Sequence, residues 1–185
     1  MSAALLMMAM HQDVQMKVLQ EIEDVIGSSN EEVEYEMLNS LTYLEMVIKE
    51  SMRLFPVLPV IGRHCKKDVQ IEKCVIPAGA TIMINIFNTQ RSTKNWGEDA
   101  HLFDPERFST ENISKIHPYA FIPFSGGPRI CIGLKYAMNV MKIILVHFLR
   151  NYKITTSLKY EELQMKIAVS LKISQKYMIQ IEKRN

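Results

Sequence analysis

The stretch Phe124-Ser-Gly-Gly-Pro-Arg-Ile-Cys-Ile-Gly133 places one cysteine between a glycine-rich loop and an apolar segment that predicts a long helix over residues 134–152. A thiolate at Cys131 would face the first turn of that helix, where unpaired backbone N–H groups and the helix dipole favour negative charge. Gly126 and Gly127 remove side chains from the loop, and Gly133 does the same after the cysteine. The backbone can therefore approach a flat, bulky group.

Two further side chains of this stretch suit such a group. Arg129 could pair in bidentate fashion with a carboxylate on its rim, and Phe124 could form an aromatic wall. Together with Cys131 they fit a haem whose iron is held by one cysteine thiolate. Two other interpretations stay open at this point. A lone cysteine is more often a small core hydrophobe, and a glycine loop before a helix can cradle phosphate, although no GxGxxG or GK[ST] pattern is present.

Composition narrows the class of protein. The 185 residues are 48% hydrophobic, which is enough for one core and favours a single domain. The net charge of +2 gives no argument for nucleic-acid binding. The 3 cysteines contain no CxxC pair, which argues against a disulfide framework or a zinc site and fits a reducing compartment. No run reaches the roughly 20 apolar residues of a membrane helix, and the apolar start lacks the basic region and cleavage site of a signal peptide.

The spacing of apolar residues predicts two helices before the cysteine loop. Residues 2–26 read as one helix, with Ser2 as its cap and Gly27 as its stop. Residues 38–55 read as an amphipathic helix that Pro56 ends. Its apolar stripe is expected to comprise Leu41, Leu44, Val47, Ile48 and Phe55. In the helix after the cysteine loop, Lys135, Lys142 and Arg150 are expected to face outward.

The remaining segments predict short strands. Residues 57–63 are extended, and residues 69–71, 74–76 and 81–87 alternate as strands, with Pro77-Ala-Gly79 as a turn. Cys74 is expected to be buried. Residues 88–96 read as a loop, and 152–156 as a strand. Residues 165–181 predict a β-hairpin that turns at Ser174-Gln-Lys. The fold class is therefore mainly α with small β-sheets.

Two charged motifs stand outside the cysteine loop. Glu50-Ser-Met-Arg53 puts two opposite charges three residues apart on one helix, which from the residues alone is an exposed pair worth about 0.2–0.5 kcal/mol. Phe103-Asp-Pro-Glu-Arg-Phe108 is a turn that carries one arginine, Arg107.

The segment Pro123–Gly133 closely resembles the haem-thiolate signature of the cytochrome P-450 superfamily. Its residues are most similar to those of the animal microsomal fatty-acid ω-hydroxylase branch, the fourth family, and within it to the insect-like form. The two charged motifs resemble the E-x-x-R helix and the P-E-R-F signature of the same superfamily. The resemblance runs over essentially all 185 residues and implies the C-terminal portion of a single cytochrome P-450 domain, over 1–185, with an incomplete fold.

This resemblance implies a role for each candidate residue. Cys131 would be the catalytic residue and the axial ligand of the haem iron. The other haem contacts would be Arg129, Arg63, Phe124, Gly127 and Gly133. Glu50, Arg53 and Arg107 would form one buried structural triad. The substrate pocket would be lined by Val57, Leu58, Val60 and Ile61, and touched by the tip of the C-terminal hairpin. Gln90 departs from the family, which usually has histidine there.

The implied activity is a monooxygenase that inserts one oxygen atom from O2 into a C–H bond of a hydrophobic substrate, fatty-acid or xenobiotic-like. Its cofactor would be haem b, with electrons from NADPH through NADPH–cytochrome P-450 reductase. Cytochrome b5 would be a candidate second partner, and no nucleic acid is expected as a partner. The enzyme would be held on the cytosolic face of the endoplasmic reticulum membrane by an anchor that this chain does not contain.

The distal residues that deliver protons to oxygen are expected before Met1, so the chain alone is expected to be inactive. Two alternatives remain: a non-catalytic, truncated haem-binding fragment, and a helical scaffold without a cofactor.

Overall fold

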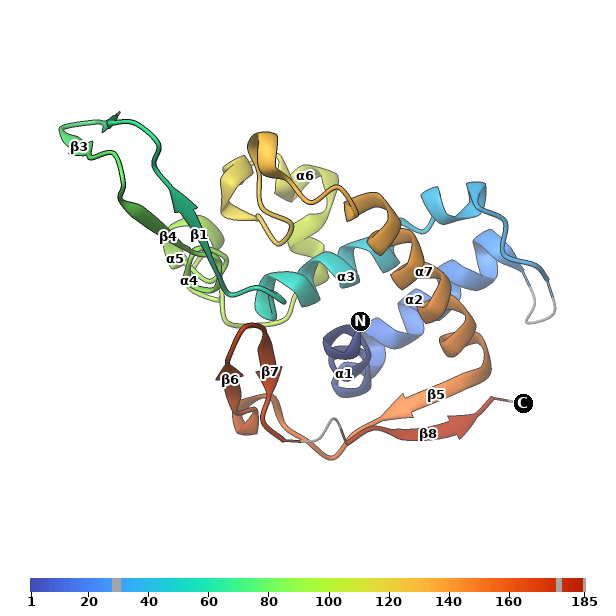
Figure 1. The fold of residues 1–185 in the computed structure, drawn as a ribbon. Coiled ribbons are helices and arrows are strands. Elements are labelled where there is room, and N and C mark those ends of the chain that lie inside the picture. Colours follow the sequence, from blue (N-terminus) through green and yellow to red (C-terminus); the bar gives the residue numbers. More distant parts are fainter. Residues whose placement is uncertain (28–30, 176–177, 185) are drawn as a thin grey trace.

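The computed structural model describes residues 1–27, 31–175 and 178–184. Its centre is built from longer helices that lie across one another (Figure 1). These are α1 (Ser2–Met10), α2 (Gln12–Ile26), α3 (Thr42–Leu54) and α7 (Leu134–Asn151). Short helical turns lie between them, and one lies after α7. Those between are η1 (Glu36–Asn39), α4 (Ile86–Thr89), α5 (Thr93–Trp96), η2 (Pro105–Phe108), α6 (Thr110–Ile113), η3 (Pro118–Ala120) and η4 (Gly127–Arg129), and the one after α7 is η5 (Tyr160–Glu162). Within the described ranges, no helix combines the length and the apolar character needed to cross a membrane.

The strands form antiparallel pairs rather than one sheet. They are β1 (Val60–His64) with β4 (Thr81–Asn85), β2 (Val69–Ile71) with β3 (Cys74–Ile76), β5 (Tyr152–Thr155) with β8 (Gln180–Lys183), and β6 (Met165–Ile167) with β7 (Leu171–Ile173). The first two pairs project together as an arm, and β5–β8 runs beneath the helices (Figure 1). The predicted class, mainly α with small sheets, is confirmed.

The main core lies where α1, α2, α3, α7 and β5 meet. The predicted apolar stripe of α3 is buried along its whole length, from Leu41 to Phe55. Helix α3 begins at Thr42, later than expected, because residues 36–39 form a separate 3₁₀ turn. It ends at Leu54, before Pro56, as predicted.

Residues 2–26 were predicted to form one helix, but the structure divides them into α1 and α2. His11 leaves the helical region with φ −110° and ψ 85°, which separates α1 from α2. The break frees carbonyls at the end of α1, and two glutamines satisfy them. Gln12 donates to Ala9 O at 2.9 Å, and Gln15 donates to Met8 O at 3.0 Å. Helix α1 has Met1 rather than Ser2 at its N-cap, whereas Gly27 ends α2 as predicted.

Helix α7 buries two cations that were expected to face solvent. Lys142 donates to Leu38 O and to a Glu45 carboxylate oxygen, both at 2.7 Å, and Arg150 donates to Glu31 O at 2.9 Å. The prediction from charge was wrong because a long basic side chain can be buried when its charged end has hydrogen-bond acceptors.

Three local predictions are also corrected. Cys74 is exposed, because the β2–β3 pair lies in the projecting arm, away from the core, whereas Cys65 is buried. Residues 88–96 were expected to be a loop but contain the second half of α4 and all of α5. The C-terminal hairpin turns at 168–170 instead of at Ser174, whose N–H continues the ladder to Gln164 O at 2.7 Å. The predicted strand after that turn instead supplies β8, which pairs with β5; residues 176–177 of the prediction lie outside the described residues.

Candidate functional site

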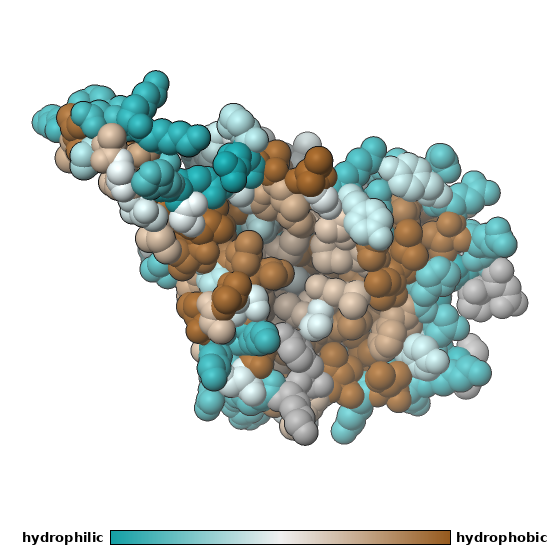
Figure 2. All heavy atoms as spheres, in the orientation of Figure 1, coloured by the Kyte–Doolittle hydropathy of each residue, from teal (hydrophilic) through white to brown (hydrophobic). Residues whose placement is uncertain are grey.

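A cavity of about 590 Å³ opens between α1, α3, α7, the cysteine loop and the β6–β7 hairpin. Figure 2 shows apolar side chains gathered around this hollow. Much of its wall comes from segments far apart in the sequence, including Ser51, Met52 and Phe55 of the α3 region and Met141 of α7. A volume of this size is typical of sites that enclose a small molecule or a cofactor.

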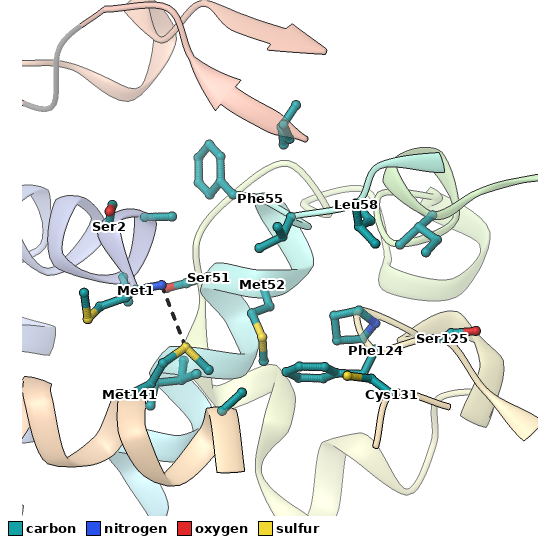
Figure 3. Close-up of a pocket in the computed structure, with 18 of the residues that line it drawn as sticks. Met1, Ser2, Ser51, Met52, Phe55, Leu58, Phe124, Ser125, Cys131 and Met141 are labelled. Atoms are coloured by element: carbon teal, nitrogen blue, oxygen red, sulfur yellow. Dashed lines mark hydrogen bonds between the residues drawn. The ribbon is translucent and has the colours of Figure 1, made fainter. Parts of the chain in front are cut away.

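Cys131 lies at this cavity, in the loop that leads into α7. Its side chain is exposed, and its N–H donates to Phe124 O at 2.9 Å, which folds the loop back on itself. In Figure 3 Cys131 and Phe124 lie side by side, with Leu58 and Phe55 on the far side of the cavity. An exposed sulfur at an apolar cavity can reach a bound group.

The glycines of the loop leave room beside the sulfur. Gly127 has φ +65°, and a Cβ atom built there would meet no atom within 4 Å. Gly133 holds the N-cap of α7, and a Cβ atom there would lie 3.8 Å from the Cys131 Sγ atom. Ser125 also has a positive φ, of 66°, a conformation that is costly for a residue with a side chain. The loop therefore keeps an open backbone surface.

Among the described residues that line the cavity, the charged side chains are Arg63, Arg129 and Lys172, which are all positive. Arg63 donates to Ser125 Oγ at 2.7 Å, which ties strand β1 to the cysteine loop. Arg129 is exposed at the rim, in η4. This arrangement of cations around an apolar hollow fits a ligand with an apolar body and an acidic edge.

The predicted substrate-lining residues divide between two faces of one segment. Val57, Leu58 and Ile61 line the cavity, whereas Val60 does not. Successive side chains of a strand point to opposite faces, and Ile61 and Arg63 of β1 share the cavity face. Val60 is therefore corrected to the opposite face.

Behind the cavity, the structure brings Glu50 and Arg53 together as a fully buried pair. Arg53 donates from Nε and Nη2 to the two carboxylate oxygens at 2.6 and 2.7 Å. Its remaining N–H groups donate to the carbonyls of Gln90, Ala100 and Leu102. Burial raises the pKa of Glu50, while the hydrogen bonds from Arg53 and from the Asp104 N–H act in the opposite direction.

Arg107 joins this pair less directly. Its Nε lies 3.8 Å from the Glu50 Oε1 atom, beyond hydrogen-bond distance, and its shorter ion pair is with Asp99, at 2.7 Å. That ion pair is a hydrogen bond which lowers the pKa of Asp99. Arg107 also donates to the carbonyls of Trp96 and Asp99. The cluster thus fixes the backbone of residues 96–104 against α3.

Sequence reasoning missed several residues of the site. Met52 and Phe55 line the cavity from α3 and its C-cap, and Leu171 to Ile173 line it from β7. The three-residue spacing of Met52 and Phe55 could have indicated a shared helix face. The family resemblance placed the C-terminal hairpin at the pocket, but with its tip at Ser174. That β7 supplies the contact instead depends on the fold, where Leu171 N–H donates to Val57 O at 2.9 Å.

A haem is compatible with this geometry on the observations above. A thiol faces the cavity, an open glycine backbone adjoins it, and two guanidinium groups stand where acidic substituents of a porphyrin could be paired. The residues that would hold it are Cys131, Arg63, Arg129, Phe124, Gly127 and Gly133.

Comparisons with known proteins agree with this arrangement. The cytochrome P450 family model matches residues 1–181. Probable cytochrome P450 313a2 of Drosophila melanogaster is 42% identical over 98% of this chain and 37% of its own length. Probable cytochrome P450 4ac1 of the same organism is 37% identical over 97% of this chain and 35% of its own length. Cytochrome P450 4g15, also of that organism, is 34% identical over 96% of this chain and 31% of its own length. The chain thus spans about a third of the length of these relatives, and over that span it belongs to the cytochrome P450 family.

Proposed function

We propose that this chain supplies the thiolate-bearing portion of a haem monooxygenase, with Cys131 as the axial ligand of the iron. The observation that carries the proposal is the single thiol at an apolar cavity whose charged side chains are cationic. When bound, a haem-thiolate group activates O2 for insertion of one oxygen atom into a C–H bond. Within the parent fold, residues 1–185 would form the C-terminal portion of one domain.

The chain's own residues would bind and orient both the cofactor and the substrate. The backbone at Gly127 would let the haem approach, and Phe124 would pack against it. Gly126, predicted to act in the same way, packs instead against Tyr119, whose ring lies 3.0 Å from where a Cβ atom would be. Arg63 and Arg129 would pair with its propionates. Val57, Leu58 and Ile61 would hold a hydrophobic substrate and exclude water from it. Glu50, Arg53 and Arg107 would act structurally, by fixing the backbone behind the cavity.

The apolar wall supports a hydrophobic substrate, for which a fatty acid is the most direct candidate. The same proposal includes haem b and electrons from NADPH through a cytochrome P-450 reductase, with cytochrome b5 as a candidate second partner. It also includes a place at the endoplasmic reticulum membrane. For residues 1–185 by themselves we propose haem binding without turnover, since the chain spans little more than a third of its relatives' length.

The test is to titrate the purified chain with haemin and record the reduced carbon monoxide complex. The wild-type chain and Cys74→Ser should give the red-shifted Soret band of a thiolate ligand, and Cys131→Ser should lack it. Retention of the band in Cys131→Ser would remove that residue as ligand. Laurate hydroxylation with NADPH and reductase should stay at the level of free haem, and product well above that level would contradict the proposed inactivity.

A further inference from the structure

Gln90 occupies the end of α4, between the ion pair of α3 and the segment that leads into the cysteine loop. Its side chain is fully buried, with 0% of its surface exposed, and it does not line the cavity. A buried amide is costly unless its donors and acceptor are all used. The contacts of the Gln90 amide therefore indicate the role of this residue.

Both ends of the Gln90 amide are bonded to backbone. Its Nε2 donates to Met52 O at 3.0 Å and to Arg53 O at 3.1 Å, which are carbonyls in the last turn of α3. Its Oε1 accepts from the Ile122 N–H at 3.0 Å. Its own backbone carbonyl accepts from Arg53 Nη1, also at 3.0 Å. Gln90 thus joins the buried ion pair to residue 122 through one rigid side chain.

The hydrogen bonds that shape the cysteine loop begin at Ile122. Its carbonyl accepts from the Ser125 N–H at 3.0 Å, and the Phe124 carbonyl accepts from the Cys131 N–H at 2.9 Å. The Gln90 bridge therefore lies at the near end of a short series of hydrogen bonds that ends at the backbone of Cys131. An amide held at residue 122 limits how far this series can shift relative to α3.

We infer that Gln90 is a positioning residue that fixes the cysteine loop, and with it the Cys131 thiol, against the ion-pair end of α3. This inference rests on the proposed function only in calling the thiol an iron ligand. The chemistry of the side chain explains why glutamine is suited to the position. The three bonds need two N–H donors and one acceptor, which an amide has, whereas a neutral imidazole has one of each.

The chain contains a matched control in Gln15. That side chain is also buried and donates to two carbonyls, Met8 O and Ile154 O. It accepts from the Ile154 N–H and from Arg184 Nη2 at 3.2 Å. It joins α2 to β5, away from the cysteine loop. Replacement of either glutamine by methionine keeps nearly the same shape and removes every side-chain hydrogen bond described for it, three at Gln90 and four at Gln15. Comparison of the two variants therefore separates loss of local positioning from loss of general stability.

The experiment measures hydrogen exchange in the full chain, without haem, for Gln90→Met and Gln15→Met. Gln90→Met should raise exchange of the Ile122 amide and of residues 124–131 about tenfold, the change expected for one lost buried hydrogen bond, and should leave β5 unchanged. Gln15→Met should do the reverse. Gln90→His, which keeps an acceptor for Ile122 and one donor, should fall between the wild type and Gln90→Met.

A haem-based readout completes the test. In the haemin-loaded chain, the share of the reduced carbon monoxide complex that shows the red-shifted band should fall in Gln90→Met and stay at the wild-type share in Gln15→Met. Equal exchange of residues 122–131 in the two methionine variants would overturn the inference. Absence of the band in the wild-type chain would instead contradict the proposed function, and the exchange comparison would still decide the role of Gln90.

Discussion

Two regions of the molecule are joined by the Gln90 side chain: the ion-pair cluster of Glu50, Arg53 and Arg107, and the cysteine loop at 124–133. They differ in burial and in hydrogen bonding. In the cluster, Glu50 and Arg53 are completely buried, and each N–H direction of Arg53 has an acceptor. In the loop, Cys131 is exposed and Ile132 is fully so. The comparison shows that the chain places its buried polar bonds behind the site and leaves the site surface open.

The largest effect is expected from Arg53→Ala. The change leaves the Glu50 carboxylate buried without its partner and leaves three carbonyls unpaired, so the free energy of unfolding should fall by about 3–5 kcal/mol. Denaturant unfolding followed by circular dichroism measures it. The matched control is Lys115→Ala, which breaks the exposed pair with Glu111 and should cost less than about 1 kcal/mol. Similar losses in the two variants would remove the contrast between cluster and surface.

A smaller effect is expected in the loop itself, at Ser125. Ser125→Ala and Ser125→Gly both remove the hydroxyl that Arg63 contacts, but only glycine tolerates φ +66° without strain. The glycine variant should therefore be more stable than the alanine variant by about 1 kcal/mol. The same denaturant titration checks this. Equal stability would mean that the loop relaxes freely, and the loop would then be looser than its hydrogen bonds indicate.

Outside the cluster, the stability of the chain should respond to pH through Glu45, in the first turn of α3. Burial raises the pKa of this carboxyl, but hydrogen bonds from Lys142 and Lys49 outweigh that effect, and the net pKa lies below its ordinary value of 4.5. Because the folded pKa is the lower one, the stabilisation is present above pH 4.5 and is lost as pH falls through the folded value. The difference in unfolding free energy between wild type and Glu45→Gln should thus shrink on acidification below 4.5. A difference that grows there would reverse the sign of the shift.

The smallest effect on stability is expected from Cys131→Ser. The thiol is exposed, so its replacement should change the free energy of unfolding by less than about 0.5 kcal/mol. Cys65→Ser, at a buried position, should cost more, because a hydroxyl there needs a hydrogen-bond partner. A large loss of stability in Cys131→Ser would show that the loop is part of the fold's support rather than an open surface.

The features that could be predicted from the sequence are those that depend on neighbouring residues. Helix α7, the α3 stripe and the short strands β2 and β3 follow from local periodicity and turn residues, because those signals depend on near neighbours. The burial of Lys142 and the pairing of β5 with β8 depend on partners about a hundred and about thirty residues away, respectively, and local pattern does not contain them.

The candidate site divides in the same way. The placement of Cys131 and Arg63 at one cavity was expected from a family resemblance rather than from spacing. Gln90 was recognised only as a departure from the family. Its position between Arg53 and Ile122 required the folded chain, because the bonds join segments more than thirty residues apart.

The break at His11 has a consequence for the order of folding. Local preference favours one continuous helix over residues 2–26, and the carbonyls that the break exposes are bonded by Gln12 and Gln15, which also bond Ile154 of β5. Residue 154 lies about 140 positions along the chain, and contacts of such separation form after local ones because the loop between them must first close. We therefore expect the N-terminal segment to form a straight helix early and to bend only when β5 docks. On this expectation, the direction of α1, which forms one wall of the cavity, depends on the docking of β5, a strand near the opposite end of the chain.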